Sequence, residues 1–120
     1  MSIWQDRYFD KDEQTIIDRA FMLVLSERWL SRWPVRSITG VDIDFLRNAR
    51  ANLTLQDPPL SEERLFYAIR AVLHLVWGGL RISEDDWNEL MSYSPEEVGA
   101  TFRKADGLRK ARAMKPPGDE

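Results

Sequence analysis

The side chains that could carry out acid–base, nucleophilic or metal chemistry in this sequence are a single histidine and several groups of carboxylates. His74 is the one imidazole among 120 residues, and cysteine is absent. A thiolate nucleophile, a disulfide and every zinc site that uses cysteine are therefore excluded. No serine–histidine or histidine–metal constellation can recruit a second histidine from the same chain. The Gly78-Gly79 pair lacks the residues that complete a phosphate-binding loop, so we expect it to end a helix.

The carboxylates occur in groups that resemble acid–base pairs. These groups are Asp42/Asp44, Glu62/Glu63, Glu84–Asp86 and Glu96/Glu97. Most of them lie in the first turn of a predicted helix, where capping and the helix dipole already account for negative charge. Asp42 and Asp44 could contribute to a divalent metal site, but no Glu-x-x-His motif or calcium loop accompanies them. The sequence therefore predicts no catalytic residue, no metal site, no cofactor and no enzyme.

Basic residues gather at the C-terminal end of the chain. Residues 1–100 carry 11 basic and 17 acidic side chains, whereas Asp106 is the only acid over residues 101–115. The basic side chains of that segment are Arg103, Lys104, Arg109, Lys110, Arg112 and Lys115. They predict contact with a polyanion such as nucleic acid, assisted by Arg47 and Arg50. The other interpretation is that they complement a helix C-terminus and form a solubilising tail, and the acidic body opposes general nucleic-acid binding.

The segment 61–78 combines an almost wholly apolar helix with one narrow polar stripe. Glu63, Tyr67, Arg70 and His74 are spaced by four, three and four residues, which puts them within about 60° of one another on a helix. A helix that is apolar over the rest of its circumference must be covered on most sides, so we expect it at the centre of the fold. The stripe of Tyr67, Arg70 and His74 is a candidate contact surface; otherwise it is the solvated edge of a central helix.

The first predicted helix carries a second candidate surface. Ile17, Ala20, Phe21 and Val24 form a core stripe, while Met22, Trp29 and Trp33 lie on another side. Tryptophan is enriched at interface anchors, and five tryptophans are many for a chain of this size. Met22, Trp29 and Trp33 are therefore predicted to bind a partner or a second copy, joined by Trp4, Tyr8 and Phe9. The alternative is that the chain covers this face with its own N-terminal segment or last helix.

Helix-start patterns determine the predicted fold. Asp10–Glu13 and Ser94–Glu97 have the spacing of capping boxes, and Ser61 and Ser83 precede acidic first turns. Stops are expected at Trp33-Pro34, Asp57-Pro58-Pro59, Gly78-Gly79 and Gly107. The predicted helices span residues 11–32, 40–55, 61–78, 84–92 and 95–106. We therefore expect an all-α fold, a compact bundle of about five helices around the central apolar helix 61–78.

The expected organisation is one helical bundle domain, residues 1–107, followed by a basic and flexible tail, residues 108–120; the sequence leaves open whether the last helix continues past Gly107. The first residues lack the basic and apolar regions of a secretory signal, and the longest apolar run, Ala20–Leu25, is far shorter than the roughly 20 residues of a membrane span. We expect no membrane contact and a cytoplasmic location.

These patterns predict a non-catalytic accessory protein of a bacterial or phage type that binds another macromolecule, either a protein or multi-subunit complex or a second copy of itself. The first alternative is a helical subunit of a nucleoprotein complex that contacts the nucleic-acid backbone through the arginines and lysines named above. The second is an acidic inhibitor that occupies the basic site of a nucleic-acid enzyme.

Overall fold

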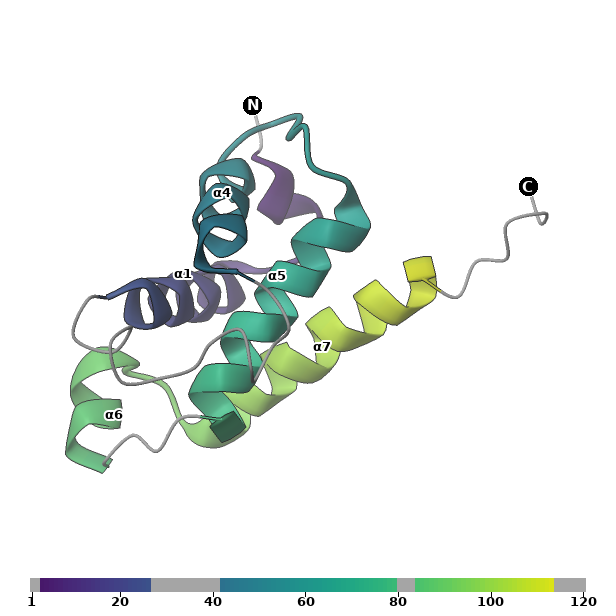
Figure 1. Cartoon of the computed structure of the whole chain (residues 1–120). Coiled ribbons are helices and arrows are strands. Elements are labelled where there is room, and N and C mark those ends of the chain that lie inside the picture. Colours follow the sequence, from purple (N-terminus) through teal and green to yellow (C-terminus); the bar gives the residue numbers. More distant parts are fainter. Residues whose placement is uncertain (1–2, 27–41, 80–83, 114–120) are drawn as a thin grey trace.

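The described part of the computed structural model comprises residues 3–26, 42–79 and 84–113 (Figure 1). Its regular elements are all helical, and no strand occurs among these residues, so the all-α prediction is confirmed. A 3₁₀ helix η1 (Trp4–Arg7) precedes five α-helices: α1 (Lys11–Leu25), α4 (Ile43–Leu53), α5 (Glu62–His74), α6 (Glu84–Leu90) and α7 (Pro95–Ala113). A π-helical turn, η2 (Leu75–Gly79), extends α5.

The helix starts follow the local sequence. The Asp10 carboxylate accepts a hydrogen bond from the Glu13 amide at 2.8 Å, and the Glu13 carboxylate accepts one from the Asp10 amide at 2.9 Å. Ser94 and Glu97 make the same reciprocal pair at the start of α7, where Pro95 is the first helical residue. Ser61 caps α5 through the Arg64 amide. Each cap satisfies amides that a helix N-terminus leaves without partners, so residues three apart in the sequence mark where these helices begin.

The helix ends differ more from the prediction. Helix α1 ends at Leu25 rather than residue 32, because Ser26 has an extended backbone with φ −69° and ψ 133°. Helix α4 spans Ile43–Leu53 rather than 40–55, and α6 ends at Leu90 rather than residue 92. Beyond α6, Ser92 adopts a positive φ of 60°, which a right-handed helix does not allow.

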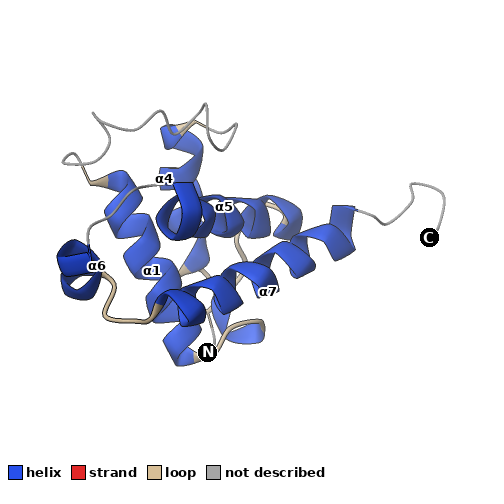
Figure 2. Ribbon diagram, turned by 90° about the horizontal axis from the view of Figure 1, so that it is seen from below, coloured by secondary structure: helices blue, strands red, loops and turns tan. Residues whose placement is uncertain are grey.

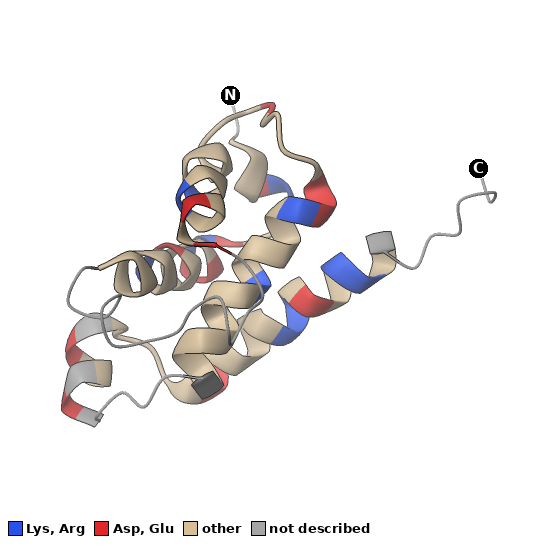
Figure 3. Ribbon diagram, viewed as in Figure 1, with Lys and Arg blue, Asp and Glu red and all other residues tan. Residues whose placement is uncertain are grey.

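Helix α7 continues through Gly107 to Ala113, so the predicted stop at Gly107 is wrong and the domain boundary drawn there falls within a helix. A helical glycine costs about 1 kcal/mol relative to alanine. Two local ion pairs offset this cost, since Asp106 contacts Arg109 at 3.4 Å and Lys110 at 3.1 Å across the glycine. These charges appear as an acidic band followed by a basic one along α7 (Figure 3). Leu108 also packs against the core on the far side of Gly107.

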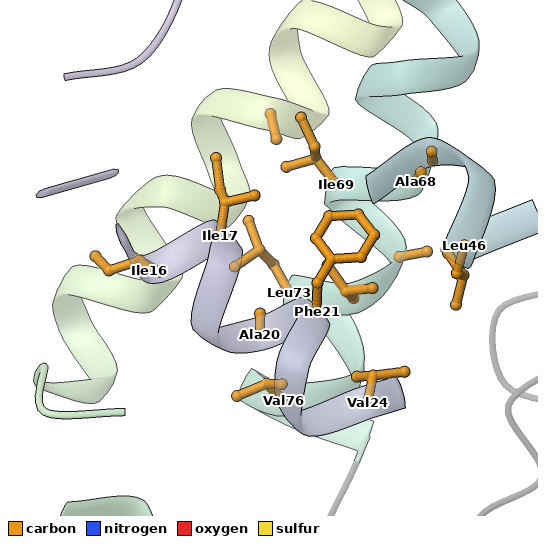
Figure 4. Packing of buried hydrophobic residues seen from close by; sticks show 14 of the residues in the cluster. Ile16, Ile17, Ala20, Phe21, Val24, Leu46, Ala68, Ile69, Leu73 and Val76 are labelled. Carbon is orange, nitrogen blue, oxygen red and sulfur yellow. The ribbon is translucent and has the colours of Figure 1, made fainter. Parts of the chain in front are cut away.

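Helix α5 lies at the centre of the molecule. Helices α1 and α4 pack on one side of it and α7 runs along another (Figures 1 and 2). The α5 side chains Leu65, Phe66, Ala68, Ile69, Ala71, Val72 and Leu73 are buried. Phe21 and Ile17 of α1 meet Ile69 and Leu73 of α5 in the core (Figure 4). The predicted central role of the apolar helix is thus seen directly in its packing.

The N-terminal segment closes one end of this core. Trp4 is 1% exposed, and its indole N–H donates a hydrogen bond to the Glu62 carboxylate at 3.2 Å. The Tyr8 hydroxyl donates to the same carboxylate oxygen. Trp4, Tyr8 and Phe9 surround the Phe66 ring, with centroid distances between 5.0 and 6.3 Å. These three aromatic residues therefore belong to the core or its edge, and their predicted place in a partner-binding face is wrong.

Substituting Gly107 with alanine should raise the free energy of unfolding by about 0.5–1 kcal/mol. A Cβ atom at this exposed helical position meets no heavy atom within 4 Å, so alanine gains helix propensity without a clash. Urea denaturation monitored by circular dichroism measures the change.

The same substitution at Gly99 of α7 is the matched contrast. A Cβ atom there would lie 2.8 Å from Cε2 of Trp77, so Gly99→Ala must displace the indole and should lower stability. A stabilising Gly99→Ala, or a destabilising Gly107→Ala, would contradict the described path of α7.

Candidate functional site

The predicted polar stripe of α5 faces α7. Tyr67, Arg70 and His74 are each half-buried, and all three contact α7 side chains. The two helices run antiparallel, so successive turns of α5 meet successive turns of α7 in reverse order. We call this contact the α5–α7 seam. Its members are Tyr67, Arg70, His74 and Trp77 of α5 and η2, and Gly99, Phe102, Arg103, Asp106 and Arg109 of α7.

Asp106 is the electrostatic centre of the seam. Its carboxylate accepts a hydrogen bond from Nε of Arg70 at 2.7 Å, and Arg109 and Lys110 approach it from its own helix. The Asp106 side chain is only 18% exposed. Burial by itself raises the pKa of Asp106, but hydrogen bonds and charge from Lys110 and hydrogen bonds from Arg70 and Arg109 outweigh it, so the pKa lies below the usual aspartate value. The carboxylate therefore joins α7 to the single arginine of the α5 stripe.

Aromatic rings and guanidinium groups fill the rest of the seam. The Arg109 guanidinium lies 5.8 Å from the Tyr67 ring centroid, and that of Arg70 lies 5.6 Å from the Phe102 centroid. The Phe102 ring also contacts His74 at 5.9 Å and Trp77 at 5.5 Å between centroids. A guanidinium group is attracted to an aromatic ring at such distances, and aromatic rings attract one another at these centroid separations. The stripe is thus a joint between two helices of the chain, and its side chains are engaged within the molecule.

Trp77 ends the seam and differs from the other members because 41% of its surface is exposed. The indole lies directly on Gly99, where any other residue would collide with it. Phe102 contacts the ring, and the Arg103 guanidinium lies 6.0 Å from its centroid. The chain therefore supports an exposed tryptophan from several sides, which fixes a large amphipathic ring at the surface.

Most of the predicted nucleic-acid-binding residues have carboxylate partners within the chain. Arg47 lies 3.5 Å from Asp44, and Arg50 lies 3.3 Å from Asp18. Lys104 contacts Glu13 at 2.8 Å, while Arg109 and Lys110 share Asp106. Arg103 has no carboxylate within 4 Å among the described residues. The side chain of Arg112 lies outside the described set. Five of the seven predicted residues thus each lie within 4 Å of a carboxylate among the described residues.

Of Met22, Trp29 and Trp33, the three main members of the predicted tryptophan face, only Met22 lies within the described residues. Met22 points outward from α1 with 53% of its surface exposed. Trp29 and Trp33 lie outside the described residues. Sequence reasoning missed Trp77, which it assigned to the covered part of the central helix. The spacing contained the necessary information, because Trp77 follows His74 by three residues and falls about 20° from Arg70 on an ideal α-helix.

The described residues contain no group of three or more histidine, aspartate or glutamate side chains that could hold a metal ion. Within the same residues, no helix has the length and apolar character required to cross a membrane. Comparison with protein-family models, with curated proteins and with solved structures gave no match to this chain.

Replacing Asp106 with asparagine should lower the free energy of unfolding by about 1–3 kcal/mol at neutral pH, because Arg70 loses a charged hydrogen-bond acceptor in a half-buried contact. Since the pKa of Asp106 is lowered by folding, its stabilisation is complete above the unfolded aspartate pKa of about 3.9 and is lost as the pH falls through the lower folded value. Urea titrations of both proteins over this pH range measure the difference, which should shrink in acid.

Asp44→Asn is the control. Asp44 and Arg47 belong to the same helix and their ion pair is highly exposed. The substitution should therefore change stability by less than about 0.5 kcal/mol. An Asp106→Asn loss no larger than that of Asp44→Asn would show that the seam does not depend on this carboxylate.

Proposed function

We propose that this chain is a non-catalytic accessory protein that binds another protein molecule, with Trp77 as the anchor of the contact. The observation that carries the proposal is the exposed indole held on Gly99 beside Arg103. Tryptophan and arginine are the residues most enriched at interface hot spots, and a ring fixed before binding loses little conformational entropy on binding.

The seam supports this anchor. Phe102 contacts the Trp77 ring, and Arg70 lies over Phe102 while its Nε binds Asp106. These contacts fix α7 on α5 and thereby set the position of Gly99 and Arg103 beneath the indole. In this proposal Tyr67, Arg70 and His74 act indirectly, as the support of the binding site rather than its surface.

The other exposed apolar side chains are weaker candidates. Met22 lies on a face of α1 that also bears the exposed residues Lys11 and Asp18. Leu55 is 44% exposed in the connection between α4 and α5. Neither is one of the side-chain types that are enriched at interface hot spots. Nucleic acid is a less favoured partner, because phosphate contacts would compete with the ion pairs of five of the predicted basic residues.

Trp77→Ala should reduce partner capture at least about tenfold, the loss typical of an interface hot spot. The tagged wild-type chain and the variant are incubated with lysate of the source organism, with and without nuclease, and the retained proteins are quantified by mass spectrometry. Circular dichroism establishes that the variant keeps its helical content.

Leu55→Ala is the matched control, since it removes a comparably exposed apolar side chain far from the seam, and it should leave capture unchanged. Met22→Ala tests the face on α1. Loss of capture with Met22→Ala but not with Trp77→Ala would move the binding site to α1, and capture abolished by nuclease would instead indicate a nucleic-acid partner.

A further inference from the structure

The outward side of α7 next to Trp77 has an unusual pattern of charge and size. Glu96, Ala100, Arg103 and Gly107 are all exposed and are spaced by four, three and four residues, so they share one face of the helix. The opposite face, which includes Val98, Thr101 and Ala105, is buried against the rest of the fold. On this exposed face the small residue Ala100 thus lies between an acidic residue, Glu96, and a basic residue, Arg103.

Two charged residues of this face, Glu96 and Arg103, are not neutralised within the described chain. Neither Glu96 nor Arg103 has an oppositely charged side chain within 4 Å among the described residues, whereas Lys104 and Lys110 on the same helix both have one. Glu96 and Arg103 are seven residues apart, which corresponds to about 10 Å along the helix. They are therefore too far apart to pair with each other.

We propose that the occupant of this face is a second copy of the same chain, whose α7 packs antiparallel to the first across a two-fold axis near Ala100. In that arrangement Glu96 of each copy faces Arg103 of the other. Two equivalent pairs of opposite charges then form across the axis, as a two-fold interface requires. The proposal rests on the proposed function and names its partner.

Size and position also suit this pairing. Helices pack at about 8–10 Å between axes, and small side chains at the contact permit the shorter separations. Ala100 lies at the centre of the crossing and Gly107 near its end, so neither obstructs a close approach. Trp77 borders the same face through its contacts with Gly99 and Arg103. Each indole would then flank the crossing and lose its exposed surface to the other copy.

Charge-reversal substitutions at Glu96 and Arg103 test this interface directly. Sedimentation equilibrium of the full chain over a range of concentrations should show reversible association from the 14.1 kDa monomer to twice that mass. Arg103→Glu and Glu96→Arg each place like charges opposite one another twice, so each should raise the dimer dissociation constant at least about tenfold. The double exchange Glu96→Arg with Arg103→Glu restores opposite charges and should return the constant to within about threefold of the wild type. Arg47→Glu, a reversal on the exposed side of α4, should have no effect.

The outcomes separate this inference from the proposed function. A wild-type chain that stays monomeric throughout overturns the dimer, as does a dimer insensitive to the single reversals or one that the double exchange fails to restore. A wild-type chain that stays monomeric but captures a different protein through Trp77 would sustain the proposed function while excluding this partner. A dimer that responds to charge exchange but not to Trp77→Ala would sustain the α7 pairing and remove Trp77 as the anchor.

Discussion

The fold depends on the need to cover α5 on nearly every side. Ten consecutive positions from Leu65 to His74 include only three polar side chains, so solvent contact on any other face would expose a large apolar area. Helices α1 and α4, the N-terminal segment and α7 each cover one part of it. The buried side chains of these elements and those of α5 belong to one hydrophobic core cluster.

Covering the polar stripe is a different problem, because Arg70 cannot be buried without a partner. Helix α7 provides that partner in Asp106, whose carboxylate meets the guanidinium at 2.7 Å, and in Phe102, whose ring centroid lies 5.6 Å from the same guanidinium. The same carboxylate pairs with Arg109 and Lys110, which supports the helix across Gly107. One acidic residue thus joins α5 to α7 and helps α7 reach its full length. Two of the basic residues that look available in the sequence, Arg109 and Lys110, are thus engaged by Asp106.

The candidate site could be predicted only in part from the sequence. The spacing of Tyr67, Arg70 and His74 correctly put them on one side of a helix, but nothing local indicated which element would face them. Trp77 belongs to the same stripe, yet its apolar character suggested burial. The ring is exposed because it lies at the end of the seam, beside the first turns of α7. Trp4 and Tyr8 suggested a binding face because local sequence does not reveal that Glu62, over fifty residues later, accepts their hydrogen bonds.

The sequence by itself determined the class of fold and three of the helix starts, because capping residues, first-turn acids and apolar periodicity act through neighbours a few residues apart. Asp10, Ser61 and Ser94 cap their helices as this local chemistry requires. Only the tertiary structure decided where α7 ends, which cations are neutralised and which tryptophan remains at the surface. Those outcomes depend on contacts such as that of Arg70 with Asp106, 36 residues away. Such a contact forms only once the chain has closed around α5.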